Sequence, residues 1–446
     1  MQRYFSSIVK VAASALLVLN AGAQKTAPAP AIPLCPGLTI VTAVNGSVGD
    51  YESIKTVESV DAKEVRLKYS SEVNDADWLG TGAQVKNLVL HRTTLIPDLQ
   101  TANVYQQVYL EKSAETIPGT TAIGTSSAVL RGLKTKGEAD LSISNAYAGL
   151  ELSADRSKFP NYYQYLQGGK IQKVGTSRMS VLVNDKPTEL PAIQATGDLV
   201  GNKVEFFFLD DGRNPLALAF RIDIEGFKPL TAEQRQLCDT MEKAAKEASN
   251  KQTGFHADPN VLMASLGGNI RCNLPNGGPK NVLRVIKINS RCAGPAAMLP
   301  GSPGGSGQMP NGSASGAGDS EGAKALEQAL SQDKKVDIYS IYFSFNSDKL
   351  REESQPTLKD IAEVMRRHPD WKLQVNGHTD GIGGDQSNLD LSKRRAAAVK
   401  DALEKQYKIA TGRLATAGYG KSQPKDTNDT LEGRARNRRV ELMKIS

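Results

Sequence analysis

The 446-residue sequence is poor in the residues that build metal centres, since it contains only four cysteines and four histidines. No two cysteines have the CxxC spacing of a zinc site, so we expect no metal site and no cofactor. After the first two dozen residues, no apolar run approaches the ~20 residues that a membrane-spanning helix needs, which excludes a polytopic helical membrane protein. Aromatic residues make up 6% of the chain, and the formal net charge is +7. Such a mild charge does not indicate a nucleic-acid partner.

The first 23 residues have the layout of a secretory signal peptide. Arg3 and Lys10 give a positively charged start, residues 11–19 are apolar, and small residues at 21–23 fit a cleavage site. The alternative, a short membrane anchor, would need a longer apolar run. We therefore expect an exported protein of the periplasm or cell envelope, with association to the outer membrane left open.

Export makes the cysteines candidates for disulfide bonds, because the compartment that receives the protein is oxidising. Four cysteines allow three pairings, and the sequence does not choose among them. The candidate disulfide cysteines are Cys35, Cys238, Cys272 and Cys292.

Composition divides the remaining chain into four segments. Residues 24–34 form a Pro-rich leader, and residues 35–292 contain many short strand-like segments with turn residues between them, which predicts a β-rich, sandwich-like domain. One amphipathic helix is expected there near 231–249. Residues 293–323 are rich in Gly, Ser and Pro, which is typical of a flexible linker with a reach of ~30 Å, so we expect two tethered bodies rather than fused ones. Residues 324–446 form the last domain.

The β-rich domain shows no sequence pattern of a known active site. It lacks a GxSxG nucleophile turn, an HExxH zinc motif and a Gly-rich phosphate loop. Its clearest strand-like segments are Glu64–Tyr69, Val104–Leu110, Ala139–Ser144 and Val204–Leu209. They are short and poor in aromatic residues, whereas the strands of an outer-membrane β-barrel need ~9–11 residues and aromatic girdles. We therefore favour a periplasmic body, with the barrel and a catalytic domain as alternatives.

Alternating and helical periodicities in the last domain predict the order β-α-β-α-β…β, an α/β sandwich with helices on one face of the sheet. The expected strands are residues 336–343, 371–376, 414–419 and 439–445, and the expected helices are residues 356–368 and 389–407.

Several motifs in this domain occur in a characteristic order. They are FSFN at 343–346, NGHTD at 376–380, NLDLSKRRA at 388–396 and EGRARNRRVE at 432–441. With this set of motifs, the segment from about Lys335 to Ile445 resembles the OmpA-like peptidoglycan-binding domain.

The resemblance implies that Asp380 and Arg395 hold the diaminopimelate residue of a peptidoglycan stem peptide. A zwitterionic amino-acid end carries an ammonium and a carboxylate, so its recognition requires one fixed anion and one bidentate cation. By the same resemblance, Asn346 and Asn388 assist the ligand. Asn388 is also expected as the N-cap of its helix. We expect Arg438 to be a structural partner for nearby carboxylates.

Other features of the motifs suggest no catalysis. His378 lacks a neighbouring nucleophile, so we expect it to position the loop through a hydrogen bond. Asp380 and Asp385 form no recognisable acid pair for glycan hydrolysis. Residues 381–384 (GIGG) depart from the family, which often has a polar residue after GHTD, and they predict a more flexible loop.

The sequence thus predicts an exported envelope protein, not an enzyme, that binds peptidoglycan non-covalently. It would tether its β-rich domain, and other envelope proteins bound there, to the wall. The alternatives are a wall-targeted enzyme and an outer-membrane β-barrel with a wall-binding domain.

Overall fold

The computed structural model describes residues 30–46, 49–75, 84–106, 114–144, 166–199, 202–222, 236, 240, 282–292 and 320–445. The expected signal peptide, residues 293–319 of the expected linker, Cys238 and Cys272 lie outside these residues. Of the helix expected at 231–249, only Gln236 and Thr240 are described, and both are helical. No helix within these ranges combines the length and the apolar character needed to cross a membrane.

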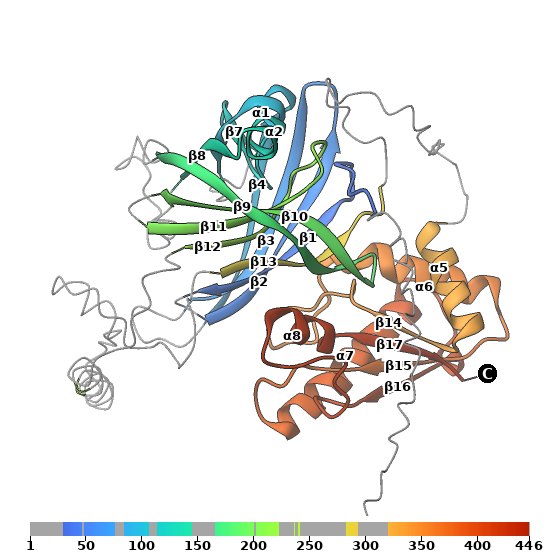
Figure 1. The fold of residues 1–446 in the computed structure, drawn as a ribbon. Coiled ribbons are helices and arrows are strands. Elements are labelled where there is room, and N and C mark those ends of the chain that lie inside the picture. The colour runs from blue at the N-terminus through green and yellow to red at the C-terminus, as the bar shows by residue number, and fades with distance from the viewer. Residues whose placement is uncertain are drawn as a thin grey trace, which may run out of the picture.

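Among the described residues, one sheet of thirteen strands builds the β-rich domain (Figure 1), in the order β6-β4-β3-β2-β1-β13-β12-β11-β10-β9-β8-β5-β7. Its first strands are β1 (Thr39–Gly46), β2 (Gly49–Val60), β3 (Glu64–Asp75), β4 (Gln84–Leu95), β5 (Val104–Tyr105), β6 (Glu115–Thr116) and β7 (Thr120–Thr121). The others are β8 (Glu138–Ser144), β9 (Leu166–Val183), β10 (Lys186–Leu199), β11 (Asn202–Leu209), β12 (Ala217–Ile222) and β13 (Val282–Asn289). Helices α1 (Ile96–Thr101) and α2 (Ser127–Thr135) accompany them. The strands expected at 64–69, 139–144 and 204–209 are confirmed in β3, β8 and β11.

The sheet folds over on itself, so that its two halves enclose a core. Strand β13 pairs with β12 and also, in parallel, with the end of β9, which closes five strands into a ring. In Figure 1 the blue strands β1–β4 cross the green strands β8–β11. Apolar side chains from both halves share one buried cluster, including Leu38, Val57, Leu67, Val181, Leu190 and Leu218. The β-rich, sandwich-like prediction is confirmed.

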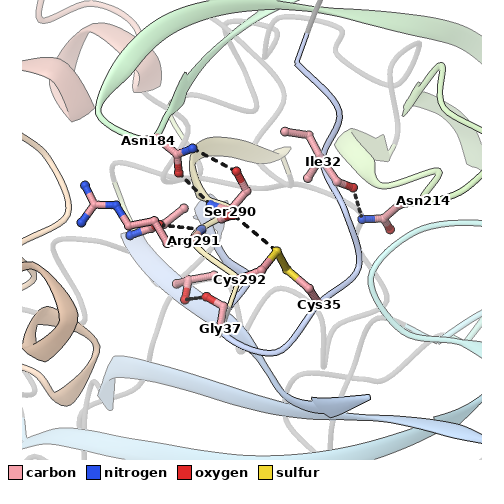
Figure 2. The surroundings of a disulfide bond; sticks show 10 residues. Ile32, Cys35, Gly37, Asn184, Asn214, Ser290, Arg291 and Cys292 are labelled. Atoms are coloured by element: carbon pink, nitrogen blue, oxygen red, sulfur yellow. Dashed lines mark hydrogen bonds between the residues drawn. A yellow bond between two sulfur atoms is a disulfide. The ribbon is translucent and has the colours of Figure 1, made fainter. Parts of the chain in front are cut away.

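A disulfide joins the beginning of this domain to its end (Figure 2). It links Cys35 to Cys292, whose Cα atoms are 5.5 Å apart. The segment before it is fixed as well, because the Asn214 side-chain amide donates a 3.0 Å hydrogen bond to the carbonyl of Ile32. Ile32 and Leu34 are buried in the core, although both lie in the segment expected to be a leader.

The C-terminal domain is a four-stranded sheet with the order β14-β17-β15-β16, with β15 and β16 parallel and β17 antiparallel to both its neighbours. Its strands are β14 (Lys335–Ile338), β15 (Leu373–Gly377), β16 (Leu414–Gly418) and β17 (Val440–Lys444). Its helices are α5 (Glu321–Gln332), η3 (Glu352–Ser354), α6 (Gln355–Arg367), α7 (Asp385–Lys405), η4 (Thr411–Arg413) and α8 (Leu431–Asn437). Helices α5, α6 and α7 share one core with the sheet, which confirms the predicted α/β architecture. Helix α5 includes the last residues assigned to the linker.

The two domains pack directly against each other, so the expectation of two bodies joined only by a linker is wrong. Tyr342 and Ala435 of the C-terminal domain share a buried apolar cluster with Val41, Ile54 and Ile286 of the β-rich domain. The composition of a linker sets how far two domains can separate, but it says nothing of whether their surfaces fit.

Polar contacts fix this interface as well. Asp185, in the turn between β9 and β10, accepts 2.8 Å hydrogen bonds from the backbone N–H of Tyr339 and from the Ser340 hydroxyl. Arg291, next to the disulfide, donates a 2.5 Å hydrogen bond to Asp360 on α6. Because these groups come from several elements, they fix the orientation of one domain on the other.

Candidate functional site

The GHTD motif begins where β15 ends, and neighbouring strands hold its backbone. The N–H of His378 donates to the carbonyl of Arg439 at 3.1 Å, and the N–H of Thr379 donates to the carbonyl of Gly420 at 3.0 Å. Asp380 therefore lies just beyond the carboxyl end of β15, and the backbone that leads to it is held between the start of β17 and the segment that follows β16.

The carboxylate of Asp380 is held by two donors. One oxygen accepts the N–H of Ile382 at 3.0 Å, and the other accepts a guanidinium N–H of Arg438 at 2.6 Å. The side chain is only 13% exposed. Each carboxylate oxygen has two lone pairs, so both can accept a further hydrogen bond from a ligand ammonium.

Arg395 projects from α7 and is fixed through one side of its guanidinium. Its Nε donates to the carbonyl of Ser347 at 2.9 Å, and its Cζ lies 4.9 Å from the ring centroid of Phe343. Burial, together with the charge of Arg438, lowers the pKa of Arg395 to about 10, so it stays protonated at neutral pH. Within the described parts of the chain, its terminal nitrogens make no hydrogen bond, which leaves them for a ligand carboxylate.

Arg438 joins two carboxylates that come from different domains. It pairs with Asp380 and also with Glu52 on β2. Burial alone would raise the pKa of Glu52, but the positive charges of Arg438 and Lys287 lower it to about 2. Arg438 thus contacts nearby carboxylates, as expected, and one of them is Asp380, which is itself expected to bind the ligand.

The two asparagines lie at the same site but differ in role. Asn346 is exposed, has a positive φ of 48° and lines the cavity described below. Asn388 is buried, and its side-chain amide donates to the carbonyl of Ile382 at 2.9 Å. The N-cap prediction for Asn388 is wrong, because α7 begins earlier, at Asp385, with Gly384 as its N-cap. Asn388 instead holds the loop that follows Asp380.

His378 does not make the hydrogen bond that we expected of its ring. Both ring nitrogens are buried and have no hydrogen-bond partner among the described residues, and the ring stacks on Tyr419 with centroids 5.3 Å apart. Burial and the charge of Arg439 lower the pKa of His378 to about 4, so the ring is neutral near pH 7. The histidine thus contributes packing rather than proton transfer at neutral pH.

Two glycines shape the loop after Asp380. The N–H of Gly381 donates to Asn428 at 2.7 Å, and a Cβ at Gly381 would lie 2.8 Å from the Asn428 Cγ. Gly383 has a φ of +92°, a region that favours glycine. The flexibility expected of this loop stays a prediction.

These side chains surround a cavity of about 380 Å³ between the two domains, a size typical of small-ligand sites. The residues of the C-terminal domain that line it include the five predicted from the motifs, which are Asn346, Asp380, Asn388, Arg395 and Arg438. The β-rich domain lines it with Ala43, Glu52, Ile54, Glu72 and Lys287. No sequence signal pointed to these five, because strand pairing and domain packing bring them to the site.

Asp385 does not belong to this cavity. Its side chain is 88% exposed and pairs with Lys421 at 2.7 Å. The described residues contain no group of three or more His, Cys, Asp or Glu side chains that could hold a metal ion. The cavity offers a ligand three acidic side chains, which are Glu52, Glu72 and Asp380, together with several cations and an apolar wall.

Comparisons with known proteins point to the same part of the chain. The model of the OmpA family matches residues 342–438. The chain is 45% identical over 101 residues to outer membrane porin F of Pseudomonas aeruginosa, covering 23% of this chain and 29% of that protein. It is 35% identical over 120 residues to the peptidoglycan-associated lipoprotein of Brucella melitensis, covering 27% of this chain and 71% of that protein. The chain thus spans under a third of the porin's length.

Among solved structures, the cell wall anchor of the T6SS from Pseudomonas aeruginosa is 32% identical, with a TM-score of 0.23, and the match covers 27% of this chain and 94% of that one. The peptidoglycan-associated lipoprotein from Burkholderia pseudomallei is 29% identical, with a TM-score of 0.22, and the match covers 23% of this chain and 87% of that one.

Proposed function

Because this chain belongs to the OmpA family through its C-terminal domain, as its motifs predicted, we propose that it binds peptidoglycan in the cell envelope. Its ligand is the zwitterionic end of a diaminopimelate residue in a stem peptide. Binding is non-covalent, and it holds the β-rich domain, with any envelope protein bound to that domain, at the wall.

The observation that carries this proposal is that Asp380 and Arg395 line one cavity with opposite charges. The ammonium of the ligand would donate to Asp380, and its carboxylate would accept from the terminal nitrogens of Arg395. Arg438 holds Asp380 in place, and Ser347 holds Arg395, so both groups are oriented before the ligand arrives. Such preorganisation improves affinity because little side-chain freedom is lost on binding.

The test is co-sedimentation of the full-length protein with purified sacculi. Asp380→Asn keeps the shape of the side chain and removes its charge, whereas Arg395→Gln removes both the charge and the guanidinium. Each should lower binding strongly. Losing one member of a desolvated charge pair typically costs about 2–5 kcal/mol. Asp385→Asn and Arg394→Gln are matched controls, because these neighbours are exposed and should bind like the wild type. Circular dichroism confirms that each variant is folded.

We further propose that the site binds without cleaving. The buried, unprotonated ring of His378 is a poor general acid at neutral pH, and Asp385 points to solvent rather than into the cavity. Incubating the full-length protein with sacculi should therefore release no soluble fragments. Release of such fragments would instead support the alternative of a wall-targeted enzyme.

Export to an oxidising compartment is part of the same proposal. The predicted signal peptide at residues 1–23 would deliver the chain there, and the Cys35–Cys292 disulfide would persist there. Mass measurement of protein isolated from the envelope should show a mature chain without the first 23 residues.

A further inference from the structure

One cation in the cavity comes from outside the family domain. Lys287 lies on β13 of the β-rich domain and is only 6% exposed, yet it lines the cavity. Its Nζ lies 5.6 Å from the ring centroid of Tyr342. Among the described residues, Nζ has no hydrogen bond and no ion pair, which is uncommon for a buried lysine.

An irregularity in the sheet places Lys287 there. The pairing of β13 with β1 shifts between Val41 and Thr42, and Ile286 is left without a partner in that register. Ile286 packs in the apolar cluster with Tyr342, while the next residue, Lys287, lines the cavity. Bulges of this kind often redirect side chains next to functional sites.

Two carboxylates attract Lys287 electrostatically, Glu52 more strongly than Asp185. Among the described residues neither forms an ion pair with it. The carboxylate of Glu52 is bound to Arg438, which also pairs with Asp380, and Asp185 is bound to Arg291 and to Ser340. Burial lowers the pKa of Lys287, which means that the folded protein disfavours its charged form. Because burial makes the positive charge of Lys287 unfavourable in the folded protein, an anionic ligand group in the adjacent cavity would stabilise that charge.

The cavity also has apolar contacts to offer at its edge. Phe345 and Ile382 line it, although they are 50% and 60% exposed. The backbone N–H of Phe345 donates to Glu72 on β3, so the β-rich domain also fixes this part of the cavity wall. These exposed apolar side chains can contact the small methyl side chains of a peptide whose charged groups occupy the pocket.

We propose that Lys287 binds a second carboxylate of the peptide whose zwitterionic end lies between Asp380 and Arg395. The binding site is then built by both domains, and the β-rich domain takes part in recognition. This inference rests on the proposed function. The ligand is a stem peptide with a free carboxylate near the zwitterionic end, such as the carboxylate at the peptide's own C-terminus.

The experiment is calorimetric titration of the full-length protein with two soluble stem peptides that contain diaminopimelate. One peptide has a free C-terminal carboxylate, and in the other this group is amidated. Lys287→Met should weaken binding of the free acid roughly ten- to a hundredfold, the loss expected for a hydrogen bond between charged groups. The variant should bind the amide as the wild type does. Lys287→Arg should retain most of the preference, and Lys170→Met, on the exposed part of β9, should change nothing.

Thermal unfolding separates this role from a structural one. Lys287→Met removes a buried charge, so its melting temperature should equal or exceed that of the wild type. Equal affinity of Lys287→Met and the wild type for the free acid would overturn the inference. Tighter binding by the variant would also overturn it, and would indicate that the β-rich domain covers the site. If the wild type binds neither peptide, the proposed function itself fails.

Discussion

Replacing Glu52 by glutamine tests whether the ion pair between the domains stabilises the fold. The substitution keeps the shape of the side chain and leaves Arg438 paired only with Asp380. The pKa of Glu52 is lowered from 4.5 to about 2, which corresponds to about 3 kcal/mol of stabilisation at about 1.4 kcal/mol per pKa unit. Because Arg438 keeps one partner and Glu52 is 26% exposed, we expect a loss of about 2 kcal/mol.

The assay is urea unfolding of the full-length protein between pH 2 and pH 7. A carboxylate with a lowered pKa in the folded state stabilises the protein fully above pH ~4.5, and this contribution disappears as the pH falls towards 2. The difference between wild type and Glu52→Gln should follow that course. Glu58→Gln, an exposed glutamate on the same strand, is the matched control and should have little effect. Equal stability of Glu52→Gln and wild type at pH 7 would refute the reasoning, as would a difference that persists at pH 2.

Three further predictions concern the disulfide, the loop after Asp380 and the ring of His378. Replacing Cys35 and Cys292 by alanine should lower the free energy of unfolding by about 2–4 kcal/mol relative to the oxidised wild type, as measured by urea unfolding. The reduced wild type should be similarly weakened, and a variant as stable as the oxidised wild type would contradict this. Gly381→Ala should weaken binding to sacculi with a smaller effect on melting temperature, because its Cβ would push Asn428 away; unchanged binding would contradict this. His378→Phe should bind sacculi as the wild type does between pH 5 and 8, because the pKa of His378 is about 4 and its ring makes no hydrogen bond to any described residue; a pH dependence in the wild type that the variant lacks would contradict a packing role.

The sequence predicts the C-terminal fold and five of the residues with which that domain lines the cavity. Strand alternation and helix periodicity depend on near neighbours in the chain, so β15, β16, β17 and α6 appear close to where they were expected. The start of α7 differs from the prediction, because a Gly-Gly pair is typical of a loop, whereas Gly384 is the N-cap of this helix. Asn388 therefore lies one turn further into the helix than its predicted position at the N-cap.

The contribution of the β-rich domain could not be predicted in this way. Glu52 and Lys287 are 235 positions apart in the sequence, and only the pairing of β1 with both β2 and β13 brings their strands together. How close these two side chains come to Asp380 then depends on how the surface of the β-rich domain fits the surface of the C-terminal domain. No local pattern in a single sequence encodes such a fit, and the linker composition suggested separation instead.

The central claim is that the cavity recognises an ammonium together with a carboxylate on the same side chain. The most direct measurement compares co-sedimentation of the full-length protein with two kinds of sacculi, one built with diaminopimelate and the other with lysine at the same position. Lysine keeps the ammonium but lacks the carboxylate that Arg395 would bind. The account predicts strong pelleting with the first kind and little with the second. Equal pelleting with both would contradict it.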